Sequence, residues 1–324
     1  PPRTLREAVQ FLAWFQTVDR MFFFGGAMQQ IDTLLLPFYE RDVESGVLSG
    51  DEEVVWYFVS LLFNDTHYHQ IGGPAPADGH DVANPLSFAM LDAMHALGIP
   101  SNVAVRLHAQ TDEELLDRAV RYLFEDGTGV AFSCSGGLDE GFARNGYPLQ
   151  LARMRAKVGC NWTALPGIEY SLQDVTRVCM VSPFLHALSE MVDDPDTPNS
   201  LETLWRKYDD HLAVAVDTIK RGFDWHYEHK ASNVPEMILN LFCHGPLERG
   251  LDISAGGVDI YNFTMDGVGL ATVADSFGAI HQRVVDEARI TWEELVAMLR
   301  ADFVGHEPER LMLQNIARYG SADS

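Results

Sequence analysis

The sequence contains little positive charge, few cysteines and no long hydrophobic run. Its 324 residues include 23 lysines and arginines against 47 aspartates and glutamates, which gives a formal net charge of -24. Such a surplus of negative charge repels phosphate backbones and anionic membrane surfaces, so we expect neither nucleic acid nor a membrane as a partner. No stretch of about 18 uninterrupted apolar residues is present, and nothing therefore indicates a membrane span.

The four cysteines show no pairing pattern. Cys134, Cys160, Cys179 and Cys243 stand apart in the chain, and none belongs to a CxxC motif. This argues against a disulfide framework, a zinc knuckle and a dithiol redox pair, so we expect reduced thiols and a cytoplasmic location. A cysteine in an apolar stretch is usually a small buried hydrophobic residue, and this interpretation is preferred for Cys179 and Cys243.

Three common motifs are also missing. The sequence contains no G-x-S-x-G elbow, no G-x-x-x-x-G-K-[ST] loop and no G-x-G-x-x-G turn. Their absence removes the usual hydrolase, phosphate-loop and dinucleotide-binding interpretations. Gly267-Val268-Gly269 has too few glycines in register for such a role, and we interpret it as a tight backbone turn.

What the sequence does contain is an alternation of helix and strand signals. With 47% hydrophobic residues, the chain can bury a large core. Segments 102–108 and 129–133 have strand character, whereas Ser/Thr-x-x-Glu patterns precede apolar residues at helical spacing. These predicted helix starts are Thr4 to Glu7, Ser49 to Glu52, Thr111 to Glu114 and Thr291 to Glu294. The alternation favours an α/β fold, and no clear domain boundary is visible.

The second half of the chain carries longer helix signals. An acidic loop at 193–200 precedes a long predicted helix, and a helical pattern covers 234–251. After two glycines, 258–263 is predicted as a strand and another helix is predicted from about Val273 to Glu287.

Cys160 is the main candidate for chemistry. It lies between a basic segment that includes Arg155 and the turn Pro166-Gly167, where a loop tip could project a thiol into a cavity. Cys134 directly follows the predicted strand 129–133, and α/β folds place ligand contacts at the carboxyl ends of strands. For both thiols, ordinary packing is the alternative interpretation.

A second constellation involves histidines. His67 and His69 would lie on one face of a strand, and with His80 or Asp81 they could form a metal site of the amidohydrolase kind. The motif is short, and further strand-end ligands lack a convincing context. Polar residues near a loop are the favoured interpretation, so we expect no metal and rank a metal-dependent hydrolase third among the functions.

Several short motifs occur in a fixed order along most of the chain. They are Pro37-Phe38-Tyr39, Gly72-Gly73 with Asp78-Gly79 and Asn84, Arg106-Leu107-His108, Gly159-Cys160, Pro166-Gly167 and the segment 256–276. Their order and spacing resemble the glycyl radical enzymes, the superfamily of pyruvate formate-lyase, the glycerol and choline enzymes and the aryl-acetate decarboxylases. No single motif is diagnostic, but the ordered set is.

The resemblance implies an α/β fold that is part of a ten-stranded barrel of the pyruvate formate-lyase-like type, with helices outside. Residues 1–324 would form one partial barrel domain. The family's glycine loop, Arg-Val-x-Gly followed by an aromatic residue, is not found in the sequence. We therefore expect a piece of a longer protein, without the N-terminal part of the barrel and without the C-terminal glycine radical domain, and inactive alone.

The resemblance also assigns roles to residues. Cys160 would become the thiyl radical that abstracts hydrogen, and Asp174 falls where several members hold a substrate-contacting aspartate. Trp162 replaces the glutamate of the Gly-Cys-x-Glu motif, which removes the usual carboxylate base and hints at a partly apolar substrate. Glu169 could substitute for that base. The predicted pocket residues are Trp162, Glu169, Phe132, Ser133 and Cys134.

The implied function is a thiyl-radical lyase that cleaves a C–C or C–heteroatom bond of a small organic substrate. Asn161 stands where the pyruvate-cleaving enzyme has a second cysteine, so acyl transfer is disfavoured. No tightly bound cofactor is expected; an iron–sulfur activating enzyme that uses S-adenosylmethionine would install the radical on the missing domain. A homodimer is a further expectation. The leading alternative is a non-catalytic barrel remnant or subunit.

Overall fold

Four parallel strands form the central sheet of the first half of the chain. The computed structural model describes residues 1–22, 27–64, 68–98, 102–127, 129–158 and 162–321. Neighbours in this sheet also follow each other along the chain, as β1 (Ala27–Gln30), β2 (Tyr68–Ile71), β3 (Val103–Leu107) and β4 (Val130–Cys134). Parallel strands in chain order, joined through helices, are the arrangement from which an α/β barrel is built.

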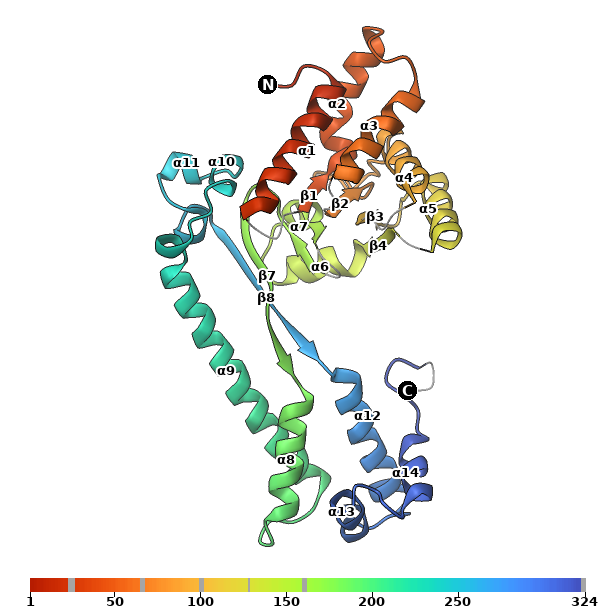
Figure 1. The fold of residues 1–324 in the computed structure, drawn as a ribbon, viewed down its shortest axis with the longest axis vertical. Coiled ribbons are helices and arrows are strands. Elements are labelled where there is room, and N and C mark those ends of the chain that lie inside the picture. Colours follow the sequence, from red (N-terminus) through yellow and green to blue (C-terminus); the bar gives the residue numbers. More distant parts are fainter. Residues whose placement is uncertain (23–26, 65–67, 99–101, 128, 159–161, 322–324) are drawn as a thin grey trace. The chain divides into compact units, whose positions relative to one another are not determined.

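Helices α1 to α5 lie together on one side of this sheet (Figure 1). They are α1 (Leu5–Phe22), α2 (Ile31–Glu44), α3 (Asp51–Asn64), α4 (Pro85–Leu97) and α5 (Glu113–Asp126). Their apolar side chains and those of the strands share one core, in which Phe58, Met90 and Val105 are completely buried. Each such side chain contributes about 1.5–3 kcal/mol by leaving water.

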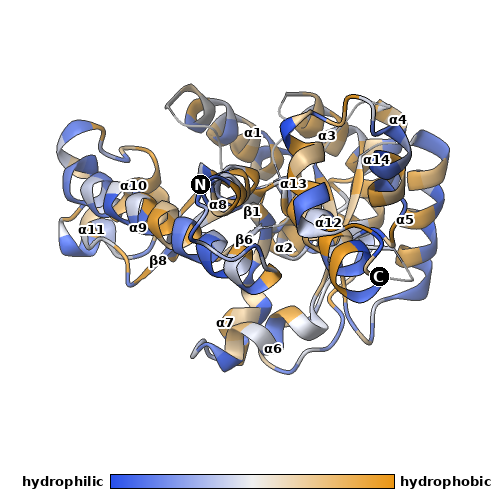
Figure 2. Cartoon of the chain, turned by 90° about the horizontal axis from the view of Figure 1, so that it is seen from below, coloured by the Kyte–Doolittle hydropathy of each residue, from blue (hydrophilic) through white to orange (hydrophobic). Residues whose placement is uncertain are grey.

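Local signals explain where α4 and α5 begin. Asn84 caps α4 by accepting a hydrogen bond from the backbone N–H of Leu86 at 3.0 Å, and Asp112 caps α5 by accepting from that of Leu115 at 2.9 Å. Helix α5 is hydrophobic on one side and hydrophilic on the other, as Figure 2 shows. Its buried residues Leu115 and Ala119 face the core, as the helical spacing predicts.

The first compact unit comprises residues 1–171 and 231–262. After β4, it continues through α6 (Gly136–Arg144), α7 (Leu149–Met154), β5 (Ala156–Val158) and β6 (Trp162–Ala164). Its later residues form two short helices and a 3-10 turn, namely α10 (Leu239–Phe242), α11 (Pro246–Arg249) and Ile253–Ala255.

The second compact unit comprises residues 172–230 and 263–324. Strands β7 (Glu169–Cys179) and β8 (Ile260–Val268) pair with each other and begin within the residues of the first unit. The helical elements are α8 (Val181–Asp193), α9 (Leu201–Asn233), α12 (Leu270–Ile280), a π-helix (His281–Asp286), α13 (Trp292–Arg300) and α14 (Glu307–Gln314). Phe184, Tyr208 and Phe277 belong to its core. The prediction of one partial barrel domain over 1–324 stays a prediction.

Several predicted elements are confirmed and others are corrected. Thr291 and Glu294 form the expected capping box of α13. The cap of α5 is Asp112 and not Thr111, whose hydroxyl hydrogen-bonds to the backbone of His108 instead. The helical pattern over 234–251 yields only α10 and α11, because prolines and glycines interrupt it.

The segment around Gly269 also differs from its prediction. Strand β8 extends to Val268, so Gly267 and Val268 are strand residues and not a turn. Gly269 alone has a positive φ, 83°, at the start of α12. The helix predicted from about Val273 to Glu287 is an α-helix as far as Ile280 and a π-helix from His281 to Asp286.

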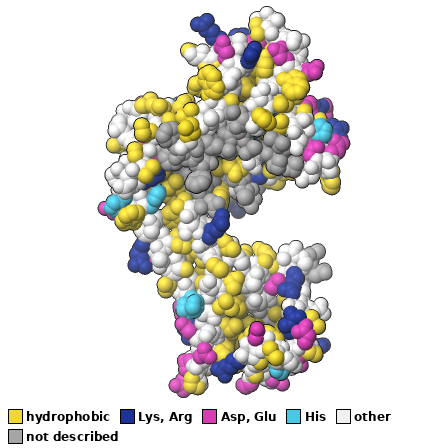
Figure 3. Space-filling view, in the orientation of Figure 1, with side chains coloured by type: hydrophobic (Ala, Val, Ile, Leu, Met, Phe, Trp, Pro, Cys, Tyr) yellow, Lys and Arg dark blue, Asp and Glu magenta, His cyan; other side chains and the backbone are white. Residues whose placement is uncertain are grey.

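Hydrophobic side chains also reach the surface. Trp14 and Trp56 are exposed in the first unit and Trp205 and Trp225 in the second, and hydrophobic side chains are visible on the face drawn in Figure 3. Exposed apolar side chains can form contacts between proteins. They do not by themselves define an interface, so the predicted homodimer stays a prediction. Of the helices that the structure describes, none combines the length and apolar character needed to cross a membrane.

Candidate functional site

The residues that flank Cys160 form a β-hairpin. Strands β5 and β6 are antiparallel, with Ala156 opposite Ala164 and Val158 opposite Trp162. Residues 159–161, and thus Cys160, lie outside the described residues, but they connect this last pair. Trp162 is half-buried in β6. Buried polar side chains hold the two strands of this hairpin in place.

A glutamine side chain attaches β5 to the central sheet. Gln70, in β2, accepts a hydrogen bond from the backbone N–H of Lys157 at 3.0 Å through Oε1. Its Nε2 donates to the carbonyl oxygen of Arg155 at 3.4 Å. Gln70 is buried. Its amide makes the hydrogen bonds to backbone groups at the start of the hairpin that a neighbouring strand would otherwise make.

An ion pair is buried at the start of the hairpin. Arg155 Nη1 lies 3.2 Å from Glu169 Oε2, and both side chains are completely buried. Arg155 Nε donates to Thr163 Oγ1 in β6 at 3.0 Å. Burial raises the pKa of Glu169, and the charge of Arg155 opposes that rise. Glu169, predicted as a pocket acid, thus faces an arginine.

A second buried arginine organises the other side of the frame. Arg106, in β3, donates to Asp139 Oδ1 at 2.5 Å and to Ser135 Oγ at 2.6 Å. Its Nη1 also donates to the carbonyl oxygens of Arg153, at 2.6 Å, and of Arg155. One side chain thereby ties β3 to α6 and to the residue at which the hairpin begins.

The glycine pair of the motif set is explained by this arginine. Gly72 and Gly73 have φ values of 63° and 101°, which glycine adopts without strain. A Cβ on Gly73 would lie 3.0 Å from the Arg106 side chain. The glycines therefore let the backbone after β2 pass closely over Arg106.

The remaining predicted pocket residues lie at the carboxyl end of β4. Phe132, Ser133 and Cys134 are opposite Val105, Arg106 and Leu107 of β3. Phe132 and Ser133 are half-buried and the Cys134 thiol is exposed. Asp174 belongs to β7, but its side chain is outside what the structure describes. The roles of these residues stay predictions.

The other cysteines and the histidine pair have different surroundings from those expected. Cys179 is exposed, which corrects its interpretation as a buried residue, and hydrogen bonds from Ser182 lower the pKa of its thiol. Cys243 is partly buried, and burial raises the pKa of its thiol to about 11.

His69 is completely buried in β2, and His67 lies outside the described residues. Within the described ranges, no three His, Cys, Asp or Glu side chains are grouped as a metal site would require.

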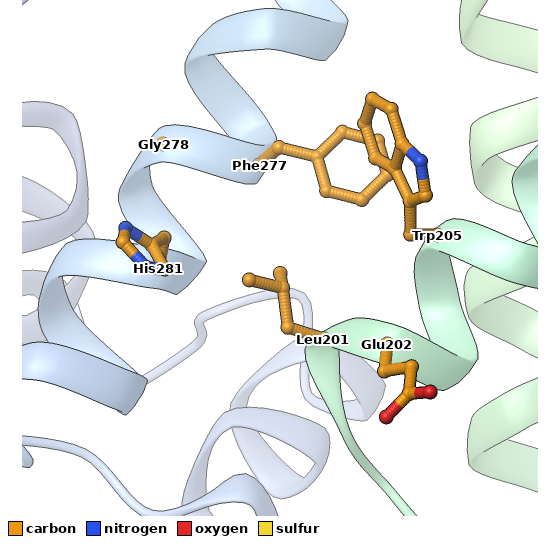
Figure 4. A pocket seen from close by; sticks show the side chains of 6 residues that line it. All are labelled: Leu201, Glu202, Trp205, Phe277, Gly278 and His281. Atoms are coloured by element: carbon orange, nitrogen blue, oxygen red, sulfur yellow. The ribbon is translucent and has the colours of Figure 1, made fainter.

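An apolar pocket of about 600 Å³ lies in the second unit, and none of the predicted site residues lines it. In Figure 4, Phe277 and Trp205 approach each other across it, with ring centroids 4.5 Å apart. Leu201, Glu202, Gly278 and His281 complete the lining. One carboxylate and one imidazole do not form a catalytic set by themselves, so the hairpin frame remains the better candidate.

Sequence reasoning singled out Cys160 and Glu169, whose roles stay predictions, but missed the arginines that hold the neighbouring described strands. Arg155 stood out only as part of a basic segment, and Arg106 only as part of a motif. No local signal marked them, because arginine is a residue type that is mostly exposed.

Comparisons with known proteins agree with this architecture. The family model described as pyruvate formate lyase-like matches residues 1–324. Trans-4-hydroxy-L-proline dehydratase of Clostridioides difficile is 24% identical over 99% of this chain and 45% of its own length. (2S)-3-sulfopropanediol dehydratase of Klebsiella oxytoca is 26% identical over 99% of this chain and 43% of its own length. The chain thus spans less than half of these relatives.

A solved structure gives the same result for the fold. The crystal structure of a glycyl radical enzyme from Archaeoglobus fulgidus superimposes with a TM-score of 0.89 and 24% identity. The match covers 98% of this chain and 45% of that one. It confirms the predicted α/β fold as part of a barrel of this type.

Proposed function

Because the chain belongs to the pyruvate formate lyase-like family of glycyl radical enzymes, we propose that it carries the thiol end of a radical lyase that acts on a small organic substrate. Cys160 is the proposed hydrogen-abstracting residue. The observation that carries this proposal is the family match over the whole chain, with Cys160 between the paired strands β5 and β6. A cysteine so placed has a fixed frame on both sides.

The chemistry requires proximity more than acidity. A glycyl radical takes the hydrogen atom of the thiol, so an S–H bond breaks, a C–H bond forms and the unpaired electron moves to sulfur. The sulfur then takes a hydrogen atom from a substrate C–H in the same way. Each transfer needs the atoms nearly in contact and shielded from water.

The relatives' names support cleavage of a carbon–heteroatom bond, since an isethionate sulfite-lyase of Bilophila wadsworthia also matches this chain, and within this class we propose elimination of water. Both curated relatives reported above are dehydratases. Loss of a hydroxyl group needs a proton donor or acceptor, and Trp162 stands where the usual glutamate is expected. Glu169 is engaged with Arg155, so we assign the substrate-contacting role to Asp174 and a lining role to Trp162. Phe132, Ser133 and Cys134 would line the pocket from the end of β4.

The proposed function includes a partner. The radical would reside on a glycine outside this sequence, and a separate iron–sulfur activating enzyme would install it with S-adenosylmethionine. No residue of this chain is assigned to bind a resident cofactor.

Electron paramagnetic resonance of the complete polypeptide, treated anaerobically with its activating enzyme, tests the proposal. We expect a glycyl doublet in the parent and in Cys160→Ala, together with loss of dehydratase turnover in Cys160→Ala alone. Cys179→Ala is the matched control, because that thiol is exposed and lies in the second unit. Absence of the doublet would leave the non-catalytic barrel as the better description, whereas full activity of Cys160→Ala would overturn the role of Cys160.

A further inference from the structure

Arg155 connects the two strands of the cysteine hairpin from one end. Its carbonyl oxygen, next to β5, accepts hydrogen bonds from Gln70 and Arg106. Its guanidinium reaches across to Thr163 in β6 and to Glu169 at the start of β7. The same residue thus fixes the position of one strand by its backbone and of the other by its side chain.

Aromatic side chains restrict the guanidinium further. Its Cζ lies 3.7 Å from the centre of the Phe142 ring and 5.1 Å from that of Tyr147. A guanidinium packed against aromatic rings has little room to turn, which restricts the directions of its N–H groups. The N–H groups of the guanidinium therefore point at Thr163 and Glu169.

The pair is poorly arranged for stability alone. Arg155 Nη2 is buried and has no hydrogen-bond partner among the described residues. Removing two charges from water costs several kcal/mol each, and an apolar pair of similar volume is often equally stable or more so. A buried pair with an unsatisfied donor is better explained by the geometry it specifies.

We propose that Arg155, together with Glu169 and Thr163, is a positioning group that holds the cysteine hairpin where the Cys160 thiol can exchange a hydrogen atom with the radical donor. This inference rests on the proposed function. Arg155 does not touch the reacting atoms and acts through the placement of β5 and β6. Val158 and Trp162 lie opposite each other, so a shift of one strand against the other changes where the two ends of segment 159–161 are attached.

Hydrogen exchange in the absence of substrate measures this placement. In D2O the thiol becomes S–D, and each return transfer puts deuterium on the glycine, so the glycyl doublet collapses to a singlet. No substrate, base or leaving group takes part in that exchange. Its rate therefore reports on the distance between thiol and glycine and is independent of the pocket.

The decisive variant is Arg155→Met/Glu169→Leu in the complete activated polypeptide. It removes both charges, so it should fold with a melting temperature close to that of the parent. We expect exchange to slow by about 10- to 100-fold, because displacements near 1 Å have effects of that size. Thr163→Val, which removes one hydrogen bond at constant volume, should slow exchange less. Arg118→Met/Asp92→Leu, which removes a pair between α5 and α4 in the same unit, should exchange at the parental rate.

The outcomes separate the two proposals. Parental exchange in a stable Arg155→Met/Glu169→Leu variant overturns the positioning role and leaves the proposed function intact. Absence of any doublet in the parent overturns both. If the double variant unfolds, Thr163→Val decides: slowed exchange with an unchanged melting temperature supports the positioning role, and an unchanged rate contradicts it.

Discussion

The two units of the molecule differ in the depth of their most buried ion pairs. In the first, Arg155 and Glu169 are 0% exposed and Arg106 is 1% exposed. In the second, Lys220 and Asp224 of α9 are 69% and 61% exposed, and even Glu287, the partner of buried Arg283, is 28% exposed. Buried charges fix backbone segments to one another, whereas exposed pairs contribute little. Rigid polar connections are thus found around the hairpin, where the proposed chemistry needs them.

The largest difference between the units is expected in their response to pH. Burial raises the pKa of Asp32 in the first unit to about 6, whereas hydrogen bonds from the backbone of Tyr319 and the side chain of Arg318 lower the pKa of Asp275 in the second. The folded state therefore binds the Asp32 proton more tightly than the unfolded state does. The free energy of unfolding should fall as the pH rises from about 4 to about 6, by roughly 3 kcal/mol in all.

Asp32→Asn should remove that loss, because an amide stays neutral and can still accept the hydrogen bond from the backbone N–H of Gly72. The measurement is urea unfolding of both proteins between pH 4 and 7, with the difference between them as the signal. Asp275→Asn is the matched comparison and should lower the free energy of unfolding by a similar amount throughout this range, since the stabilisation from a lowered pKa is lost only below about pH 4. Parallel pH profiles for parent and Asp32→Asn would contradict the assignment.

Local features of the fold could be predicted from the sequence. The strands β3 and β4 and the cap of α13 were identified because a few adjacent residues determine each of them. The helix predicted over 234–251 was wrong because its apolar spacing is helical, while Pro235, Gly245 and Gly250 interrupt the backbone.

The candidate site also has parts that could be predicted from the sequence and parts that could not. Cys160, whose role stays a prediction, was singled out from its neighbours in the chain. Its proposed positioning group was not, because Arg155 and Glu169 are 14 residues apart and only the turn after β6 brings them together. Arg106 and Asp139 are 33 residues apart and belong to different elements. Pairs of this kind follow from tertiary packing, which no local pattern encodes.

A smaller effect is expected from the cap of α13. Thr291 Oγ1 accepts a hydrogen bond from the backbone N–H of Glu294 at 3.2 Å, and Glu294 accepts one from that of Thr291 at 2.8 Å. Thr291→Ala should lower the free energy of unfolding by about 1 kcal/mol, since it leaves a helix N–H unsatisfied. Thr291→Ser keeps the hydroxyl and should stay near the parent in the same urea titration. Equal losses in both variants would show that the methyl group matters and the cap does not.

The smallest effect tests the exposed side of the comparison. Lys220 Nζ lies 2.6 Å from Asp224 Oδ2, but both side chains are largely in water, where ordering them offsets most of their attraction. Lys220→Gln, Asp224→Asn and the double variant should all unfold at the parental midpoint, in low salt and in high salt. A clear loss in either single variant that the double variant reverses would mean that this pair is coupled like a buried one. The contrast between the units would then lie in the identity of the charged groups and not in their exposure.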